Sequence, residues 1–530
     1  MALNLASPGI LIREVDLTIG RIDGSTGKIA GIVGPFEKGP VGDPVTITGE
    51  NEYVDQFGKP YDTDKQYETW MVGSSYLAYG GVLSVIRADD TGLKNGFSGT
   101  ASNVKIKSTD HYTELGYQEN ILSTVTVAAR NPGTWANDLR VSIIDAKADQ
   151  ILEGLSSTVF SNAAVGMGVT QAVPSGTVIS GAAGTSLLDG HFKGIITSKG
   201  SSTLDVKFLS HVSAAGTETA KDFNSVFKFS STGSVAIHTA GQAVSYGSTS
   251  YTSSKNWFDE QTFVTTTATK GGTATETLVK WNTIADKPGT SEYAAARGGR
   301  FDEVHVVVID AKGTVTGNAG TILEKHLSLS KAKDAEFSVG SPSYWRKYLY
   351  NNSDNIFGLS GSIIGVTTTG YTSAFTLESD GGWDQDAEGI IFNSSGKQNL
   401  TLAGGLNYGG KTDLTTTGAL DSGLDDLIGG YGQFENDTTV DVDFLLMGSG
   451  KYGQDSTRAL AEKLIAVAEV RKDAVAFISP HRGAAISDTS DDTAVTILSD
   501  SDITDNVVDF YGTISSTTFA VFDSGYKYMF

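Results

Sequence analysis

A strand–helix–strand pattern occurs twice in this sequence, once near each end of the chain. The early copy consists of an apolar run at 29–34, a helix-compatible stretch at 67–79 and a second apolar run at 82–86. The late copy consists of an apolar run at 442–447, an amphipathic stretch at 456–470 and an apolar run at 474–478. At this spacing the two strands of each copy are expected to lie parallel, joined by a right-handed crossover through the helix.

Neither copy has enough strands to bury both faces of a parallel sheet by itself. The two copies are therefore predicted to complete one α/β domain that is split in the sequence. A further strand is expected at 518–522. In the late helix, three- and four-residue spacing predicts a stripe that faces the sheet, made of Leu460, Leu464, Val467 and Val470.

The sequence between the two copies is rich in strand signals. Apolar or alternating runs at 125–127, 139–144 and 304–309 predict strands, and a helix is expected at 322–336. Residues 151–270 hold seven Lys, no Arg and seven acidic residues, yet keep alternating apolar positions, as at 202–209. Disordered segments usually carry high net charge, so an all-β insertion is favoured over disorder here.

The fold class expected is α/β plus all-β, in a discontinuous multi-domain chain whose α/β domain is split by inserted β-rich domains. The expected parts are an extended arm at 1–20, a split α/β domain at 21–92 and 396–530, a middle β-rich domain with helices at 93–150 and 276–395, and a β-rich insertion at 151–275.

Composition excludes several classes of function. With 39 basic and 61 acidic residues, the formal net charge of −22 repels nucleic acid and anionic lipid headgroups. The chain has no cysteine, which excludes disulfides, thiol catalysis and Cys-ligated metals. No basic leader and no apolar stretch of membrane-spanning length occurs, so neither a signal peptide nor direct membrane insertion is expected.

The sequence holds no convincing catalytic or cofactor motif. The string at 24–28 (GSTGK) lacks the earlier glycine and the final hydroxyl of a phosphate-binding loop, so a turn is the better interpretation. The seven histidines are scattered without metal-ligand spacing. The best oxygen-ligand cluster does not match a calcium loop and is expected to be a solvated turn; it comprises Asp380, Asp384, Asp386 and Glu388. No catalytic, cofactor-binding or metal residue is therefore assigned, which favours a structural or binding protein.

Several strings, in order along the chain, resemble the tail sheath proteins of contractile-tailed bacteriophages. They are SPGILIREVDLT (7–18), GIVGPFEKGPVGDPVTITGENEYVDQFGKP (31–60), YLAYGGVLSVIRADD (76–90), ARNPGTWANDLRVSI (129–143), the middle region 287–335, AEVRKDAVAFISP (468–480) and SSTTFAVFDSGYKYMF (515–530). Residues 151–275 match no part of the family pattern. Family members continue beyond the last string, so the end at Phe530 is expected to reflect truncation or processing.

The resemblance implies a structural subunit, not an enzyme, of a sheath built as a helix of hexameric rings. Contraction of that helix drives the tail tube through the host envelope. The implied partners are other copies of the chain, the tail tube protein, and baseplate and tail terminator proteins, with no nucleic acid. The implied location is the virion tail, after assembly in the host cytoplasm. By the same resemblance, the α/β domain faces the tube and the insertion at 151–275 projects outward.

The N-terminal arm is the candidate assembly segment. Its apolar residues stand among polar neighbours and cannot be buried by the arm alone, so they could add a strand to a neighbouring subunit's sheet. The candidate strand-exchange residues are Ile10, Leu11, Ile12 and Val15. The alternative function is an acidic β-rich surface or adhesion protein that binds glycans through its Ser/Thr/Gly-rich segments, although this does not account for a split α/β domain.

Overall fold

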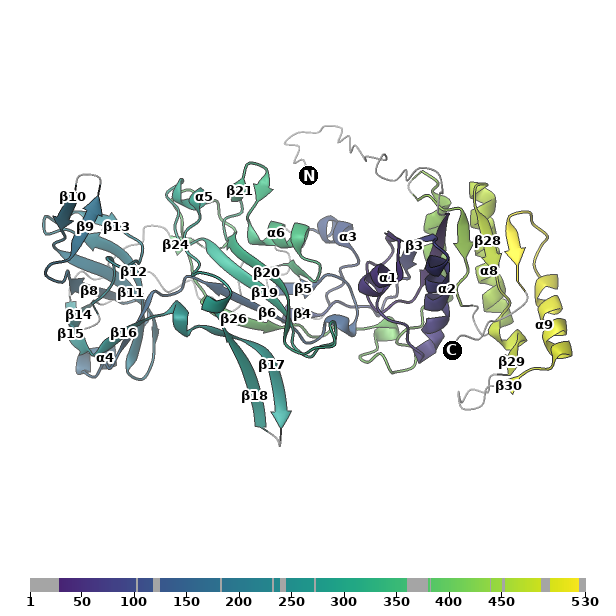
Figure 1. Cartoon of the computed structure of the whole chain (residues 1–530), viewed down its shortest axis with the longest axis horizontal. Coiled ribbons are helices and arrows are strands. Elements are labelled where there is room, and N and C mark those ends of the chain that lie inside the picture. Colours follow the sequence, from purple (N-terminus) through teal and green to yellow (C-terminus); the bar gives the residue numbers. More distant parts are fainter. Residues whose placement is uncertain are drawn as a thin grey trace. The chain divides into compact units, whose positions relative to one another are not determined.

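The computed structural model describes residues 28–101, 103–117, 124–181, 184–230, 233–238, 245–270, 273–359, 380–381, 383–438, 440–449, 453–487 and 496–523. The chain divides into two compact units (Figure 1). Unit 1 combines residues 1–90 with residues 420–530, and unit 2 consists of residues 91–419.

Unit 1 is built on a six-stranded sheet that interleaves strands from both ends of the chain. In spatial order the strands are β2 (Pro44–Ile47), β3 (Val82–Arg87), β1 (Ile29–Gly34), β27 (Phe444–Leu446), β28 (Val475–Ile478) and β31 (Ala520–Phe522). All neighbours are parallel except β2, which runs antiparallel to β3. The early and late strands join where Ala30 of β1 lies opposite Phe444 of β27. The strands expected from the two sequence copies thus share one sheet.

Helices cover both faces of this sheet. The helices of unit 1 are α1 (Glu50–Phe57), α2 (Gln66–Ala78), α7 (Leu424–Gly432), α8 (Gln454–Arg471) and α9 (Asp500–Gly512). Trp70 of α2 packs with Ile32 of β1 on one face. The neighbouring residue Gly31 faces the other side, where a side chain on it would collide with the ring of Phe434, just after α7. The sheet is therefore the middle layer of the unit.

One predicted core residue of α8 is wrong. Leu460, Leu464 and Val467 are buried as expected, but Val470 is 63% exposed. The buried position at the end of this stripe is Arg471, whose guanidinium donates to the carbonyl oxygens of Phe434 (2.8 Å) and Val440 (2.9 Å). Because these carbonyls take up the charged group, the helix is turned so that arginine, and not valine, faces inward.

The central element of unit 2 is a four-stranded antiparallel sheet. Its order is β20 (Thr321–Ser330), β19 (Glu303–Asp310), β6 (Leu139–Asp145) and β26 (Lys397–Thr401). The helix expected at 322–336 is wrong, because this segment pairs with β19 as β20. Residues 397–401, expected to belong with the α/β domain, pair instead with β6.

Two cores lie on opposite faces of the four-stranded sheet. Ile143 and Val306 pack with Trp345 of α6 (Trp345–Asn352). Their neighbours Ile144 and Val307 point to the other face and pack with Trp281.

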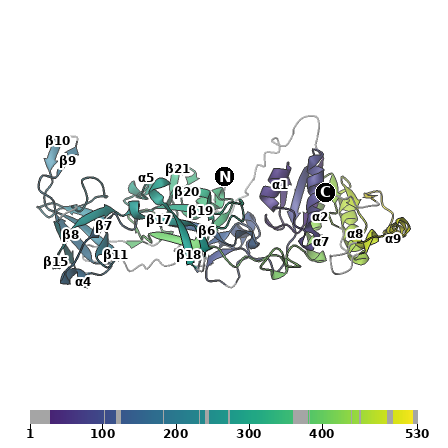
Figure 2. The ribbon, with the colours of Figure 1, turned by 60° about the horizontal axis from the view of Figure 1, so that its bottom comes forward.

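Residues 150–256 of unit 2 form an eight-stranded antiparallel sheet. Its path is β15 (Ser245–Tyr251), β14 (Gly233–His238), β8 (Gly168–Ala172), β11 (His191–Lys199), β12 (Thr203–Val212), β7 (Gln150–Glu153) and β16 (Ser253–Asn256), with β13 (Glu218–Ala220) beside β12. A separate two-stranded ribbon follows, made of β17 (Thr262–Lys270) and β18 (Thr273–Lys280), which extends from the body of the unit in Figure 1 and lies in front of it in the turned view of Figure 2.

Smaller elements complete the described structure. The remaining strands are β4 (Phe97–Gly99), β5 (Val125–Ala129), β9 (Val178–Gly181), β10 (Gly184–Leu187), β21 (Glu336–Ser338), β22 (Ser341–Pro342), β23 (Ile356–Gly358), β24 (Asp380–Gly381), β25 (Ile391–Phe392), β29 (Ile486–Ser487) and β30 (Thr496–Ile497). The remaining α-helices are α3 (Thr109–Glu114), α4 (Thr158–Asn162) and α5 (Glu292–Ala295). Mixed α/β structure combined with β-rich structure is the fold class that the sequence predicts.

Candidate assembly surfaces

Strand β31 forms one edge of the six-stranded sheet. Among the described strands it pairs only with β28, where Val521 lies opposite Phe477. Both side chains are exposed, Val521 by 47% and Phe477 by 38%, and Phe477 also contacts the Phe444 ring, with 5.4 Å between centroids. Paired residues of adjacent strands share a face, so these side chains form an apolar strip beside a strand edge that can accept another strand.

The predicted strand-exchange residues lie outside the described residues. Ile10, Leu11, Ile12 and Val15 all fall within positions 1–27, as does most of the turn expected at 24–28. The first described residue, Lys28, leads directly into β1, and its Nζ lies 5.1 Å from the Phe444 ring centroid.

Two of the family-like strings are in contact within unit 1. Arg87, in the string at 76–90, is fully buried. Its guanidinium donates to the carbonyl oxygens of Gly39 and Glu37, both at 3.1 Å, in the loop that follows β1. The arginine therefore fixes the shape of this glycine- and proline-rich loop, which is a structural role.

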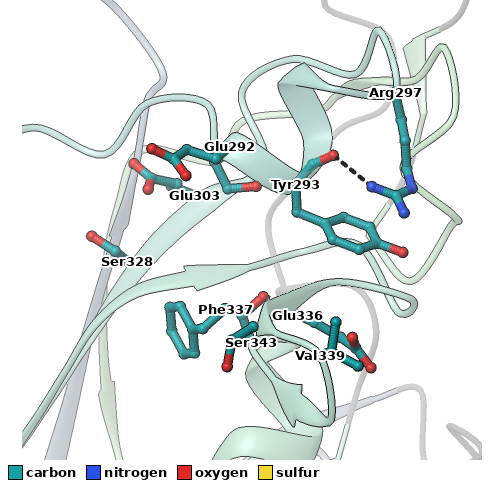
Figure 3. A pocket seen from close by; sticks show the side chains of 11 residues that line it. Glu292, Tyr293, Arg297, Glu303, Ser328, Glu336, Phe337, Val339 and Ser343 are labelled. Atoms are coloured by element: carbon teal, nitrogen blue, oxygen red, sulfur yellow. Dashed lines mark hydrogen bonds between the residues drawn. The ribbon is translucent and has the colours of Figure 1, made fainter.

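A cleft of about 520 Å³ opens in unit 2 between α5 and the β21–β22 hairpin (Figure 3). Its lining residues are Ser291, Glu292, Tyr293, Arg297, Glu303, Ser328, Glu336, Phe337, Ser338, Val339 and Ser343. On the hairpin, Phe337 is 51% exposed and Val339 is fully exposed. Phe337 packs edge-on against Tyr348 of α6, so the hairpin lies on the α6 side of the four-stranded sheet.

Charge is unevenly distributed along this cleft. Glu292 and Glu303 stand near one end, and Arg297 stands at the other, above Glu336 of the hairpin (Figure 3). Arg297 stacks 3.5 Å from the centroid of the Tyr293 ring and donates to the Tyr293 carbonyl oxygen at 3.2 Å. Burial raises the pKa of Glu303, although the amide of Gly289 donates to its carboxylate at 2.7 Å.

One polar group in the cleft lacks a partner. Ser343 is 2% exposed, and its hydroxyl makes no hydrogen bond to any described part of the chain. Buried hydroxyl groups are normally hydrogen-bonded, so this one is an unsatisfied polar group within the wall of the cleft.

Unit 2 also contains buried charges that no sequence motif indicates. Lys331 and Asp145 form an ion pair at 2.9 Å with both side chains fully buried. Lys207 is also buried; it donates to the Ala146 carbonyl oxygen and lies 3.6 Å from the centroid of the Phe301 ring. Burial lowers the pKa of Lys207 to about 7. These groups are enclosed by protein, so they hold loops and strands together and offer no surface for a substrate.

The acidic cluster at 380–388 is tied into unit 2 by ion pairs. The Asp384 carboxylate accepts hydrogen bonds from the Tyr344 hydroxyl and from Arg346, the latter at 2.7 Å. Asp386 stands 3.8 Å from Lys333. Within the described residues, no three His, Asp or Glu side chains are grouped so that they could hold a metal ion.

Net charge is concentrated in unit 1. Its residues include 32 acidic and 14 basic side chains, a net of −18, whereas unit 2 has 29 acidic and 25 basic side chains, a net of −4. In the part of the chain that the structure describes, no helix is long and apolar enough to cross a membrane.

No protein-family model matches the chain. A tail sheath protein of Vibrio phage KVP40 is 23% identical over 556 aligned residues, which cover all of this chain and 70% of the relative. A tail sheath protein of Enterobacteria phage T4 is 32% identical over 102 residues, which are 19% of this chain and 15% of the relative.

Two solved structures were also matched. A sheath tail protein from Listeria innocua is 10% identical, with 44% of this chain and 35% of that protein covered at a TM-score of 0.15. A sheath tail protein from Desulfitobacterium hafniense is 14% identical, with 47% and 38% covered at a TM-score of 0.14. Superpositions this limited add no argument about the fold. The similarity to the KVP40 protein, which covers the whole chain, confirms that this protein resembles the tail sheath proteins of contractile-tailed bacteriophages.

Proposed function

We propose that the chain is a structural subunit of a contractile tail sheath. In this proposal it assembles as a helix of hexameric rings around the tail tube and contracts to drive the tube through the host cell envelope. The observation that carries the proposal is the alignment of the whole chain with a phage tail sheath protein. The subunit performs no enzymatic step, and the work of contraction comes from the free energy of assembly.

The proposed partners follow from the same role. They are further copies of the chain, the tail tube protein, and baseplate and tail terminator proteins, with no nucleic acid and no direct membrane insertion. The protein would assemble in the host cytoplasm and remain in the tail of the virion. The charge of −22 is consistent with the absence of a nucleic-acid partner.

The proposed domain roles are those that the family resemblance implies. Residues 1–20 are an arm for neighbouring subunits, the split α/β domain faces the tube, and the insertion at 151–275 projects outward. The interleaved sheet of unit 1 supports a split α/β domain, except that residues 396–419 belong to unit 2.

We propose that Ile10, Leu11, Ile12 and Val15 add to the sheet of a neighbouring subunit. The edge of β31 supports this, because an exposed edge with an apolar strip beside it can take up an extended segment. Main-chain hydrogen bonds would then link subunits while their bodies move.

Assembly of the full chain tests the proposal. The chain should form rings or tubes in negative-stain electron microscopy, and salt should promote them, because it screens the repulsion between copies of charge −22. Ile12→Pro should block assembly without unfolding the subunit, since proline removes a ladder donor, whereas Ile12→Val should assemble normally. Dispersed monomers at every concentration and salt level would overturn the proposal and would favour the adhesion alternative if glycans bind.

A further inference from the structure

The β17–β18 ribbon presents a row of side chains that no described part of the chain covers. At its base, Phe263 and Val279 pack with Trp281. Arg140 holds the following residues of β17 by donating to the Val264 carbonyl oxygen and the Thr267 hydroxyl, both at 3.3 Å. Beyond this base, residues 275–278 are exposed, and Leu278 is 54% exposed.

The exposed row has an alternating chemical pattern. Glu276, Leu278 and Lys280 are two residues apart on β18, so they lie on the same side of the strand. Along the five residues 276–280, this side of the strand therefore carries an acidic, an apolar and a basic side chain in turn. Lys280 donates to the Asp259 carbonyl oxygen at 3.0 Å, which leaves its other N–H groups for a partner.

The cleft between α5 and the β21–β22 hairpin complements the basic and apolar part of this row. Figure 3 shows Glu292 with Glu303 at one end, the apolar Phe337 on the hairpin side, and Arg297 above Glu336 at the other end. The carboxylates are not grouped for a metal ion within the described structure. The cleft thus suits an extended segment that carries a cation followed by an apolar residue on the same side of the strand.

The base of the ribbon and the hairpin wall of the cleft lie on opposite faces of the four-stranded sheet. The base of the ribbon packs with Ile144 and Val307 on one face. The hairpin contacts Tyr348 of α6, whose core lies on the other face with Ile143. One copy therefore cannot bring Leu278 of its own ribbon against Phe337 of its own hairpin. Contact between two different surfaces on successive copies is heterologous, and such contacts generate rings or helical filaments.

We propose that the β17–β18 ribbon of one subunit binds in the cleft between α5 and the β21–β22 hairpin of a second copy of this chain. Lys280 pairs with Glu292 and Glu303, and Leu278 packs against Phe337 and Val339. This contact rests on the proposed self-assembly and adds a subunit joint distinct from the N-terminal arm.

The absence of cysteine from the chain permits a direct test. Leu278→Cys and Val339→Cys each replace an exposed side chain, so both variants should fold. Mixed and oxidised under assembly conditions, they should give a disulfide-linked dimer on non-reducing gels, and the double variant should give a ladder of oligomers. In the matched control, Val470→Cys is used in place of Val339→Cys; Val470 lies on α8 and is 63% exposed. The control should give neither the linked dimer nor the ladder.

Charge exchange provides an independent readout. Lys280→Glu should raise the protein concentration needed for assembly about tenfold, because it turns an attractive pair into a repulsive one. Glu292→Lys in the same chain should restore assembly. The exposed Lys325→Glu makes the same charge change elsewhere in unit 2 and should assemble like the parent.

Each result decides between two claims. Rings or tubes that form without any disulfide between the Leu278→Cys and Val339→Cys variants would overturn this contact but leave the sheath function standing. Disulfides only between two copies of Leu278→Cys would show ribbon pairing with ribbon, which also overturns it. Neither assembly nor a cross-link at any concentration would overturn both the contact and the sheath function.

Discussion

Replacing Lys331 should destabilise unit 2 far more than replacing Lys333. The Nζ of Lys331 lies 2.9 Å from Asp145 and donates to the carbonyl oxygens of Phe301 (3.1 Å) and Asn393 (2.9 Å). Both charged side chains are fully buried. Lys331→Met would leave the carboxylate buried without its counter-charge and two carbonyl groups without this donor.

The expected loss in the free energy of unfolding is about 3 to 5 kcal/mol, the usual cost of breaking a buried ion pair from one side. The amides of Ser395 (2.8 Å) and Gly396 (2.7 Å) still donate to Asp145, which places the loss toward the lower end, about 3 kcal/mol. Lys333→Met breaks an exposed pair with Asp386 and should cost less than about 1 kcal/mol.

Guanidinium unfolding followed by tryptophan fluorescence is the suitable assay. Five of the six tryptophans belong to unit 2, and Trp383 lies 5.1 Å from the Nζ of Lys331. The double variant Lys331→Met/Asp145→Asn should lose less than the sum of the single variants, since neither charge then remains. If Lys331→Met unfolds at the same denaturant concentration as Lys333→Met, the buried pair does not stabilise the unit as argued.

Three further predictions concern stability. Gly430→Ala in α7 should destabilise unit 1 by about 1 to 3 kcal/mol, because the added Cβ would stand 2.5 Å from Val33. The added Cβ of Gly429→Ala meets nothing within 4 Å, so this variant should stabilise the helix by about 1 kcal/mol. Thermal unfolding of both variants measures the difference. Burial lowers the pKa of Lys207 to about 7, whereas an unfolded lysine keeps its ordinary pKa. Between these two pH values the amine is neutral in the folded protein and takes up a proton on unfolding. Unit 2 should therefore become more stable as pH rises from 7 to about 10. Lys207→Met should remove that slope in denaturant titrations across this range. Burial alone raises the pKa of Glu324, but side-chain hydrogen bonds, led by the one from His326, hold this pKa below its usual range. The stability that these bonds provide is therefore lost as pH falls through the lowered pKa. Glu324→Gln should flatten the acid side of a plot of melting temperature against pH.

Local patterns were sufficient to predict most of the α/β sheet. Five of its six strands are short apolar runs, and α2 and α8 carry stripes at helical spacing, so these elements could be identified without knowing their partners. The edge strand β2 has a mixed polar sequence and was not predicted. The prediction that Val470 is buried was wrong because the helical pattern treats arginine as an exposed residue. The structure buries Arg471 by satisfying its guanidinium with carbonyl groups from another segment, which no local pattern can indicate.

The segment 321–330 shows the limit of periodicity as a signal. Ile322, Leu323, Leu327 and Leu329 can be placed on a helix or along an irregular strand. The segment forms a strand because it pairs along the length of β19. Register shifts in this pairing disturb the simple alternation of buried and exposed residues. The cleft could not be predicted for a related reason, since α5, the start of β19 and the β21–β22 hairpin meet only in the folded unit.

The split sheet raises the question of how strands 414 positions apart find each other, as Ala30 and Phe444 do. Unit 2 provides an answer within its own structure, because Lys94 and Leu406 exchange two main-chain hydrogen bonds, at 3.1 Å and 3.0 Å. Once unit 2 is folded, this bridge reduces the flexible loop between the paired strands to roughly 100 residues, which lowers the entropic cost of closure by about 1 kcal/mol. Folding of the inserted unit thus favours closure of the sheet that surrounds it in the sequence. Strands β27, β28 and β31, which are made last, can then complete a sheet whose first strands are already tethered nearby.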